Sequence, residues 1–514
     1  MSKNTSIATL LESLIFYATV KLYLSEEDAL VARNKLLELF SLDAPGEKTE
    51  VLGDLQSEIL NPLVNHAVEK GITSEEERLL FESKLMGMVT PCPSAVIAEF
   101  DHIFAREGVD AATDYLREIS VNSNYIRMED IEKNIKWTAP GELGDLIITI
   151  NLAKPEKDAK TIERERLDQS SYPTCMLCTS NMGFAGTQTR PARHALRIIP
   201  LFLNDEKWYL QYSPYVYYKD HIIVLTAEHR PMVISPDTFV ELLDFVGIFP
   251  HFFCGSNAEL PIVGGSILSH EHFQGGAKVL PMFKRAARSE FKHKDFSNTK
   301  IQILDWYNSV VRLCSDDNEE LANCAGYFLD FWRGYSDESV NILASTKKEK
   351  HNTFTPIASV RNKEYVLDLI LRNNRTDEAH PHGIFHPTKD MHHIKKEGIG
   401  LIEAMGLFIL PGRLSQEMKR IAQILQGKAP LDFKALSADA MLEKHFHMIA
   451  QLANDNGCDL TTEESHRAIT EYINNVCRKI LECTAVFKNT KEGQDAFRLF
   501  MNKAGCKPVK QMSN

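Results

Sequence analysis

The sequence predicts an α+β protein with helices at both ends of the chain and strands between them. Residues 1–135 carry apolar side chains at helical spacing, and residues 431–514 return to that spacing. Residues 136–430 contain short β-branched and aromatic runs bounded by turn residues, which is typical of strands. A chain of 514 residues is too long for one small core, so we expect two or more domains.

The N-terminal segment is predicted to be helical and to carry no chemistry. Apolar residues recur from Leu10 to Val20 at near-helical spacing. Ser25 and Thr73–Ser74 are each followed by acidic residues, the pattern of an N-cap and a first helical turn. We therefore expect helices here that serve as a scaffold or an interface.

The central segment is predicted to form strands and a core helix. Leu146–Ile150 has the composition of a strand, which Pro155 closes. A helix is expected to begin at Ser235–Pro236 and to bury Phe239, Leu242, Leu243 and Val246. Further strands are expected at residues 195–203, 208–212 and 221–226.

The second half of the chain is predicted to form another α+β unit. Residues 357–360 and 365–371 form an expected hairpin around Arg361–Lys363. The apolar run from Ile399 to Leu410 is predicted to be helical up to Pro411. The tail is predicted to be helical as well, with a helix N-terminus at residues 461–464.

The composition excludes several classes of function. A net charge of −12 argues against general nucleic-acid binding, which needs a basic face. No apolar run approaches the length of a membrane span, and the first residues lack the layout of a signal peptide. Ten cysteines spread over this length do not form a disulfide framework. We expect a cytoplasmic, reducing compartment, in which paired cysteines bind metal.

The most informative stretch is Gly264–Gly276, which contains two histidines and a glutamine at alternate positions. If this stretch is extended, His270, His272 and Gln274 point to the same side. Three nitrogen-bearing groups on one face suit the handling of a phosphate, and the flanking glycines let the backbone approach a charged group. The alternative is a chance histidine pair, in the core or on the surface, beside an ordinary glycine turn.

His272 is the best candidate nucleophile. A neutral imidazole can attack phosphorus and form a phosphoramidate, which splits one displacement into two easier steps. Gln274 can donate its amide N–H to a phosphoryl oxygen as charge develops there. A glutamine cannot act as an acid, which fits a leaving group, such as a sugar phosphate, that needs no strong protonation.

Cys175 and Cys178 form a Cys-x-x-Cys, a spacing at which two thiolates can hold one tetrahedral zinc ion from a tight turn. A redox pair is one alternative, but the neighbouring residues do not suggest a thioredoxin-like strand and helix. A buried turn without metal is another. His229 and His270 are candidates for the remaining ligands, which would make His270 a structural residue.

The sequence His-Glu-His-Phe-Gln at residues 270–274 resembles the His-Pro-His-x-Gln signature of galactose-1-phosphate uridylyltransferases. These form the transferase branch of the histidine-triad superfamily, and a glutamate here replaces the proline of the better-known class. The rest of the chain is similar to the second, longer class of that family nearly from end to end. The segments that carry this similarity are Tyr212–Tyr218, Phe249–Phe253, Gly255–Asn257, Leu371–Thr376 and His392–Glu397.

The resemblance implies two histidine-triad-like halves with antiparallel sheets, at residues 136–290 and 291–430, between helical segments at 1–135 and 431–514. It implies a ping-pong reaction in which UDP-glucose transfers UMP to His272, and galactose 1-phosphate then takes it to give UDP-galactose. The implied cofactor is structural zinc. We expect a homodimer that binds UDP-sugars and hexose 1-phosphates, and neither nucleic acid nor membrane.

The resemblance also implies roles for individual residues. Asn257 and Ser266 correspond to uridine or phosphate contacts, although their spacing differs from that of the family. Lys396 and Glu403 lie in a segment similar to the hexose-recognition region, with surface ion pairs as the alternative. The implied zinc ligands are His270, Cys175, Cys178 and His229.

A second histidine cluster has several interpretations. His380-Pro381-His382 is similar to a His-x-His that binds iron in one branch of the family, and His386, His392 and His393 lie nearby in sequence. A second metal, substrate contact and plain surface exposure are all left open. Arginines that could contact the diphosphate, without a role assigned to any, are Arg190, Arg193, Arg197, Arg372 and Arg375.

Two other functions fit parts of the sequence. One is a nucleotide hydrolase or phosphorylase of the same superfamily, but such hydrolases carry a third histidine where this chain has Gln274. The other is an inactive zinc-dependent assembly protein, which would not need to keep both His272 and Gln274. The sequence therefore favours a uridylyltransferase.

Overall fold

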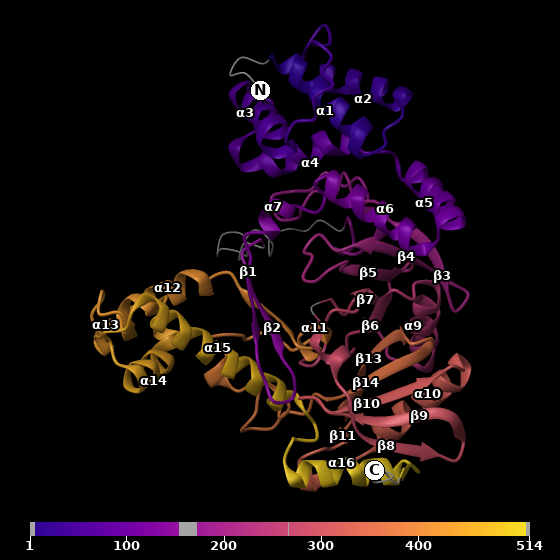
Figure 1. Ribbon diagram of the computed structural model, residues 1–514, viewed down its shortest axis with the longest axis vertical. Helices are drawn as coiled ribbons and strands as arrows, with labels where there is room; N and C mark the ends of the chain where they lie inside the picture. Colours follow the sequence, from indigo (N-terminus) through magenta and orange to yellow (C-terminus); the bar gives the residue numbers. More distant parts are fainter. Residues whose placement is uncertain (1–5, 154–171, 266, 510–514) are drawn as a thin grey trace. The chain divides into compact units, whose positions relative to one another are not determined.

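The computed structural model describes residues 6–153, 172–265 and 267–509 (Figure 1). These residues divide into two compact units. Unit 1 holds the described residues of 6–129, 172–216 and 220–229, and unit 2 holds the others. Both units combine helices with antiparallel strands, so the predicted α+β class is confirmed. The four-segment division of the chain stays a prediction.

The N-terminal segment is helical, as predicted. Ser25 caps α2, since its Oγ accepts a hydrogen bond of 3.1 Å from the backbone N–H of Asp28. At the start predicted from Thr73–Ser74, Glu75–Glu77 forms a short 3-10 turn and Ser74 makes no side-chain cap bond. None of the described helices is both long and apolar enough to cross a bilayer. The helices are α1 (Ile7–Lys21), α2 (Glu26–Leu39), α3 (Asn61–Glu69), α4 (Arg78–Val89), α5 (Pro93–Glu107), α6 (Val109–Asn122) and α7 (Met128–Ile131).

Unit 1 also contains an antiparallel meander of β3 (Ile199–Leu203), β4 (Glu206–Tyr212) and β5 (Ile222–Thr226). The strand predicted from residue 195 therefore begins four residues later. Trp208 and Leu210 on β4 are fully buried and alternate with the less buried Lys207 and Tyr209, so the first part of the strand has one core face.

Unit 2 is built on antiparallel strands that lie side by side in the order β16-β8-β9-β10-β14-β13-β6-β7. All of them except β16 are labelled in Figure 1. The predicted hairpin is confirmed, because β13 and β14 pair from end to end around Asn362 and Lys363, both of which have positive φ. Helices α9 (Pro236–Ile248) and α10 (Asn318–Gly334) pack together and against β13. The strands are β6 (Phe252–Ser256), β7 (His272–Ala277), β8 (Ala287–His293), β9 (Phe296–Leu304), β10 (Val310–Ser315), β13 (Asn352–Arg361), β14 (Glu364–Asn373) and β16 (Lys507–Pro508), with a separate pair, β11 (Ser345–Thr346) and β12 (Glu349–Lys350).

A smaller sheet in unit 2 corrects one prediction. The run from Ile399 to Leu410 is not one helix, because only α11 (Leu401–Ala404) is helical and β15 (Leu407–Pro411) follows it. Gly406, with φ of 96°, turns the chain between them. A continuous apolar run also fits a strand buried on both faces, and periodicity alone does not separate the two. In this sheet β2 (Leu146–Asn151) pairs in parallel with β15 and antiparallel with β1 (Ile135–Ala139).

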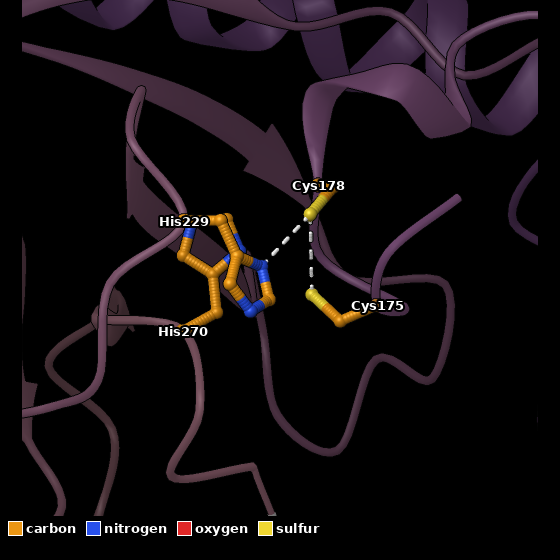
Figure 2. A group of neighbouring side chains, drawn as sticks. All are labelled: Cys175, Cys178, His229 and His270. Atoms are coloured by element: carbon orange, nitrogen blue, oxygen red, sulfur yellow. Dashed lines mark hydrogen bonds between the residues drawn. The ribbon is translucent and has the colours of Figure 1, made fainter. Parts of the chain in front are cut away.

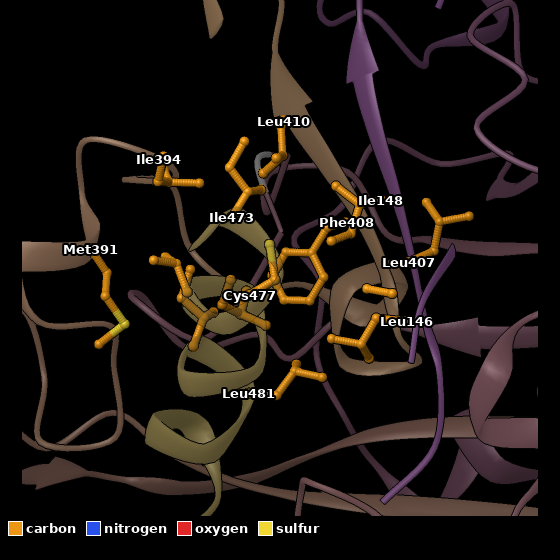
Figure 3. Packing of buried hydrophobic residues seen from close by; sticks show 14 of the residues in the cluster. Leu146, Ile148, Met391, Ile394, Leu407, Phe408, Leu410, Ile473, Cys477 and Leu481 are labelled. Carbon is orange, nitrogen blue, oxygen red and sulfur yellow. The ribbon is translucent and has the colours of Figure 1, made fainter. Parts of the chain in front are cut away.

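The C-terminal helices cover this smaller sheet. Phe408 on β15 is fully buried, with Ile473, Cys477 and Leu481 of α15 in the same hydrophobic cluster (Figure 3). The predicted cap of α15 is confirmed, because Thr461 forms a capping box with Glu464. These helices are α12 (Leu414–Leu425), α13 (Phe433–Ala438), α14 (Phe446–Asn456) and α15 (Thr462–Thr484). The last helix, α16 (Lys491–Lys503), packs instead against α10, where Phe500 contacts Phe328 and Phe331.

Glu417 on α12 is a buried carboxylate surrounded by basic side chains. It accepts hydrogen bonds from Arg413 (2.7 Å) and His445 (2.9 Å), and Lys444 lies 2.5 Å away. Burial opposes its ionisation, but the hydrogen bonds from His445 and Lys444 and the charge of Arg413 outweigh burial and lower the pKa of Glu417 to about 2. The carboxylate is therefore ionised in the folded protein at neutral pH.

We expect Glu417→Gln to destabilise the protein at neutral pH, and the difference from wild type to shrink in acid. Unfolded glutamate has a pKa of about 4.3, above that of folded Glu417. The stabilisation is therefore complete above the unfolded value and is lost as the pH falls toward the folded one. It amounts to roughly 3 kcal/mol of unfolding free energy. Urea unfolding of both proteins at pH 7 and pH 3 measures it, and an equal difference at both pH values would contradict the assignment.

Candidate active site

A cavity of about 470 Å³ in unit 2 contains the predicted nucleophile. His272 and Gln274 of β7 form one part of its lining. The 257–265 loop contributes Asn257, Gly264 and Gly265. The 395–403 segment, which leads into α11, contributes Lys395, Gly398, Gly400 and Glu403. The volume is within the range of about 300–1,000 Å³ that is usual for small-molecule sites.

Strand β7 presents the two catalytic candidates together. Gln274 pairs with Gly255 of β6, so this part of the motif is extended. Alternate residues of a strand share a face, which places His272 and Gln274 on the cavity side and buries Phe273 on the other. The predicted common face of these two residues is therefore confirmed.

The same prediction was wrong for His270. Strand β7 begins at His272, and residues 267–271 are not part of it. His270 therefore does not share the cavity face, and it is almost fully buried elsewhere. A strand boundary within a run of histidines leaves no signal in the pattern of apolar residues, so the sequence could not reveal it.

The environment of His272 favours a neutral imidazole with one nitrogen available. Its Nδ1–H donates a hydrogen bond of 2.8 Å to the carbonyl oxygen of His270. This bond fixes the tautomer and leaves the lone pair on Nε2. Burial lowers the pKa of His272 to about 4, so the ring is uncharged at neutral pH. A neutral imidazole with a free Nε2 lone pair is the form that can attack phosphorus.

The 395–403 segment places a cation and an anion in the cavity. Lys395 Nζ lies 3.0 Å from Glu403 Oε1 and donates to the carbonyl of Ile409 at 3.2 Å. Glu403 lines the cavity, as its predicted role requires, but Lys396 is exposed and does not. Lys395, which no sequence pattern singles out, lines the cavity instead. Two adjacent lysines differ only in which way each points, so residue type could not distinguish them.

Asn257 lies where two walls of the cavity meet, and these walls are the 257–265 loop and the 395–403 segment. Its Oδ1 accepts a hydrogen bond of 2.9 Å from the backbone N–H of Leu401. It is buried and lines the cavity, in keeping with its predicted contact to substrate. Ser266, the other residue predicted for this contact, lies outside the described residues.

The four predicted metal ligands lie together (Figure 2). The ligand atoms of Cys175, Cys178, His229 and His270 are all within 4.8 Å of one another. The two sulfur atoms are 3.5 Å apart, and Cys178 Sγ lies 3.1 Å from His229 Nδ1. Asn181 shapes the turn, because its side-chain amide donates to the carbonyls of both cysteines at 2.8 Å.

This donor set fits a structural zinc ion. Two thiolates and two imidazoles are a common zinc ligand set, and four protein ligands leave no open position for catalysis. Burial is the main cause that raises the pKa of Cys178 to about 11, so without a cation the thiol stays protonated at neutral pH. A zinc ion binds the thiolate, so its uptake here would release protons.

Purified protein is expected to hold about one zinc ion per chain, and Cys175→Ser is expected to lose it. The melting temperature should fall as well, because metal binding is coupled to folding. Elemental analysis and thermal unfolding measure the two effects. Cys92→Ser is the matched control, because Cys92 is exposed and outside the ligand group. A zinc-free preparation with full stability and activity would make the Cys-x-x-Cys a packing feature.

The second histidine cluster is not part of this group of four candidate ligands. His380 Nδ1 lies 2.8 Å from Asp377, on the surface. The rings of His382, His386 and His392 have centroids 5.3–6.4 Å apart. His386 and His392 each donate one ring N–H to the carbonyl of Pro387. A second metal here stays a prediction.

The arginines offered for diphosphate binding have different surroundings. Arg190 donates to the carbonyl of Pro173, and Arg197 is buried and donates to those of Thr90 and Pro91. Arg193 lies over the ring of Tyr125. Arg372 instead donates to the backbone carbonyls of Val263 and Ile399, which belong to the two walls of the cavity.

Comparison with known proteins identifies related sequences along the whole chain. Residues 24–231 match the family model of the galactose-1-phosphate uridyl transferase N-terminal domain, and residues 245–450 match that of the C-terminal domain. Proteins named galactose-1-phosphate uridylyltransferase are 46% identical in Caldanaerobacter subterraneus subsp. tengcongensis (97% of this chain, 98% of that protein) and 44% identical in Bacillus subtilis (99% and 100%). One from Fusobacterium nucleatum is 45% identical, over 97% and 99% of the two chains.

Proposed function

Because the chain belongs to the galactose-1-phosphate uridylyltransferase family, we propose that it exchanges UMP between UDP-glucose and galactose 1-phosphate through a uridylyl group on His272. The supporting observation is the arrangement of His272 and Gln274 on one face of β7, inside a cavity. The bond from His272 Nδ1 to the carbonyl of His270 leaves Nε2 as the attacking atom.

In the first half-reaction, His272 Nε2 attacks the α-phosphorus of UDP-glucose. The bond from that phosphorus to the bridging oxygen breaks, and glucose 1-phosphate leaves with the electron pair. The ring becomes positively charged, and the carbonyl of His270 stabilises it through the Nδ1–H bond. The amide of Gln274 donates to a phosphoryl oxygen as charge develops on it. In the second half-reaction a phosphate oxygen of galactose 1-phosphate attacks the same phosphorus, and Nε2 leaves with its lone pair.

The 395–403 segment is proposed to recognise the sugar phosphate. Glu403 can accept hydrogen bonds from hexose hydroxyl groups, and Lys395 can contact the phosphate. Coulombic attraction to Glu403 and Glu397 outweighs burial and raises the pKa of Lys395, so it is a cation at neutral pH. Asn257 is proposed to contact the uridine or its phosphate.

Zinc is proposed to have a structural role here. When bound by Cys175, Cys178, His229 and His270, it would hold the chain two residues before His272 in place. It would thereby orient the start of β7 without touching the substrate. The homodimer and the cytoplasmic location stay predictions.

A labelling experiment tests the proposed function. The protein is incubated with UDP-glucose labelled in the uridine, without acceptor, and then chased with galactose 1-phosphate. The expected result is an acid-labile, base-stable protein adduct that disappears as labelled UDP-galactose forms. Rapid release of UMP without acceptor would instead identify a nucleotide hydrolase of the same superfamily. Absence of both adduct and exchange would overturn the proposal.

A further inference from the structure

Arg372 is a buried arginine to which the proposed uridylyl transfer assigns no role. It lies on β14 and is 2% exposed. Its Nη2 group donates to two backbone carbonyls, that of Val263 at 3.3 Å and that of Ile399. Its Nη1 group is buried and has no hydrogen-bond partner among the described residues. Burial lowers the pKa of Arg372 to about 10, so the guanidinium is charged at neutral pH.

The two carbonyl partners belong to the two walls of the cavity. Val263 directly precedes Gly264 and Gly265 of the 257–265 loop. Ile399 lies between Gly398 and Gly400 of the 395–403 segment. All four of these glycines line the cavity. Glycine has no side chain that could hold its backbone in place, so both walls depend on contacts made by their neighbours.

The two walls are in close contact with each other. A Cβ atom added to Gly398 would lie 2.9 Å from the carbonyl oxygen of Ile262 and 3.6 Å from that of Gly264. One added to Gly400 would lie 3.0 Å from Asn257 Oδ1. The walls therefore have no room to approach further, and a donor that holds both carbonyls keeps them from separating.

We propose that Arg372 is a positioning residue that ties the 395–403 segment to the 257–265 loop and so fixes Glu403 and Lys395 relative to His272. The inference rests on the proposed function, because it assigns the 395–403 segment to the hexose phosphate. A planar guanidinium can serve two carbonyls at once, which a lysine ammonium on a flexible stem does less well. The 257–265 loop has a backbone bridge of its own, from Ala258 to Gly264, so the 395–403 segment is the wall that shifts when Arg372 is removed.

The test compares Arg372→Lys and Arg372→Met with wild type in steady-state exchange and in binding of UMP, which has no hexose. We expect the KM for galactose 1-phosphate to rise about 10-fold in Arg372→Lys, the effect of one lost hydrogen bond from a charged group, and further in Arg372→Met. Affinity for UMP should stay within about twofold of wild type. UMP is proposed to contact Asn257 of the 257–265 loop, and this loop keeps its backbone bridge from Ala258 to Gly264. If Arg372 only supported the fold, the variants would contain a smaller fraction of active protein. The apparent kcat would then fall, without a rise in the KM for galactose 1-phosphate that leaves the affinity for UMP unchanged.

Two further variants complete the test. Arg312→Met is the matched control, because Arg312 is a buried arginine on neighbouring β10 whose partner is Asp368. It should lower the melting temperature and leave the KM for galactose 1-phosphate unchanged. Gly398→Ala should reproduce the KM effect of Arg372→Lys, since its methyl group pushes the walls apart, and it serves if Arg372→Met does not fold.

The outcomes separate this inference from the proposed function. An unchanged KM for galactose 1-phosphate in Arg372→Lys and Gly398→Ala would overturn the positioning role. An equal loss of affinity for UMP and for galactose 1-phosphate would overturn it as well, because the whole cavity would then be disturbed. A wild-type protein without exchange activity would instead refute the proposed function.

Discussion

Replacing His272 with asparagine is expected to abolish uridylyl exchange and to leave the fold intact. The loss should reach roughly 10⁴–10⁶-fold, the scale on which removal of a covalent nucleophile acts. Asparagine keeps a polar group beside the carbonyl of His270 but offers no lone pair that can attack phosphorus. The measurement is UDP-galactose formed per active site, with circular dichroism and zinc content as checks on the fold.

A glycine at the same position gives a sharper test of the role. His272→Gly leaves a space in the cavity that a diffusible imidazole can enter, so added imidazole should restore part of the exchange activity. Restoration should depend on the concentration of uncharged imidazole, because only that form has a free lone pair. Full exchange in His272→Asn, with no added imidazole, would remove His272 from the mechanism.

Gln274→Ala is expected to slow both half-reactions by roughly 10²–10³-fold, as the loss of one oxyanion donor does. Gln274 lies on the same face of β7 as His272, two residues further along, so its amide can reach the phosphoryl group that His272 attacks. The two rates are measured separately, as release of glucose 1-phosphate in a single turnover and as transfer to galactose 1-phosphate. If Gln274→Ala has the wild-type rate in both half-reactions, Gln274 is a packing residue with no role in catalysis.

Gln274→His should change the fate of the intermediate. The uridylyl group must survive until the second sugar phosphate arrives, so the site should contain no group that activates water. A histidine at this position could take a proton from water or give one to a leaving group. We expect more UMP released for each UDP-galactose formed, measured with and without galactose 1-phosphate. An unchanged ratio would place the exclusion of water elsewhere in the cavity.

Local patterns in the sequence predicted much of this structure. The caps at Ser25 and Thr461 and the hairpin of β13 and β14 were predicted because each depends on a few neighbouring residues. Cys175 and Cys178 were predicted as ligands because a Cys-x-x-Cys brings both sulfur atoms to one turn. His272 and Gln274 were predicted to share a face because side chains of a strand alternate with a period of two residues.

What the sequence could not show depends on contacts between distant segments. β15 is a strand because β2 lies beside it, while its own apolar run fits a helix equally well. Lys395 lines the cavity because Glu403 and the carbonyl of Ile409 hold its ammonium group there, whereas Lys396 is exposed; these partners lie further along the chain, so the two lysines themselves do not reveal the difference. The proposed role of Arg372 depends on its hydrogen bonds to the backbone carbonyls of Val263 and Ile399. Every residue has a backbone carbonyl, so the residue types give no signal of this contact.

The parallel pairing of β2 with β15 also has a consequence for how the chain is made. Leu407 pairs with Ile147, so β2 can pair with β1 early, but most of the chain must be synthesised before β2 has its parallel neighbour β15. At about 5–20 residues per second, that interval lasts on the order of ten seconds or more. Contacts of such high sequence separation form late in folding, since a long loop must close first. Ile409 of β15 lines the cavity, so a nascent or truncated chain that ends before β15 lacks part of the site, whatever else has folded.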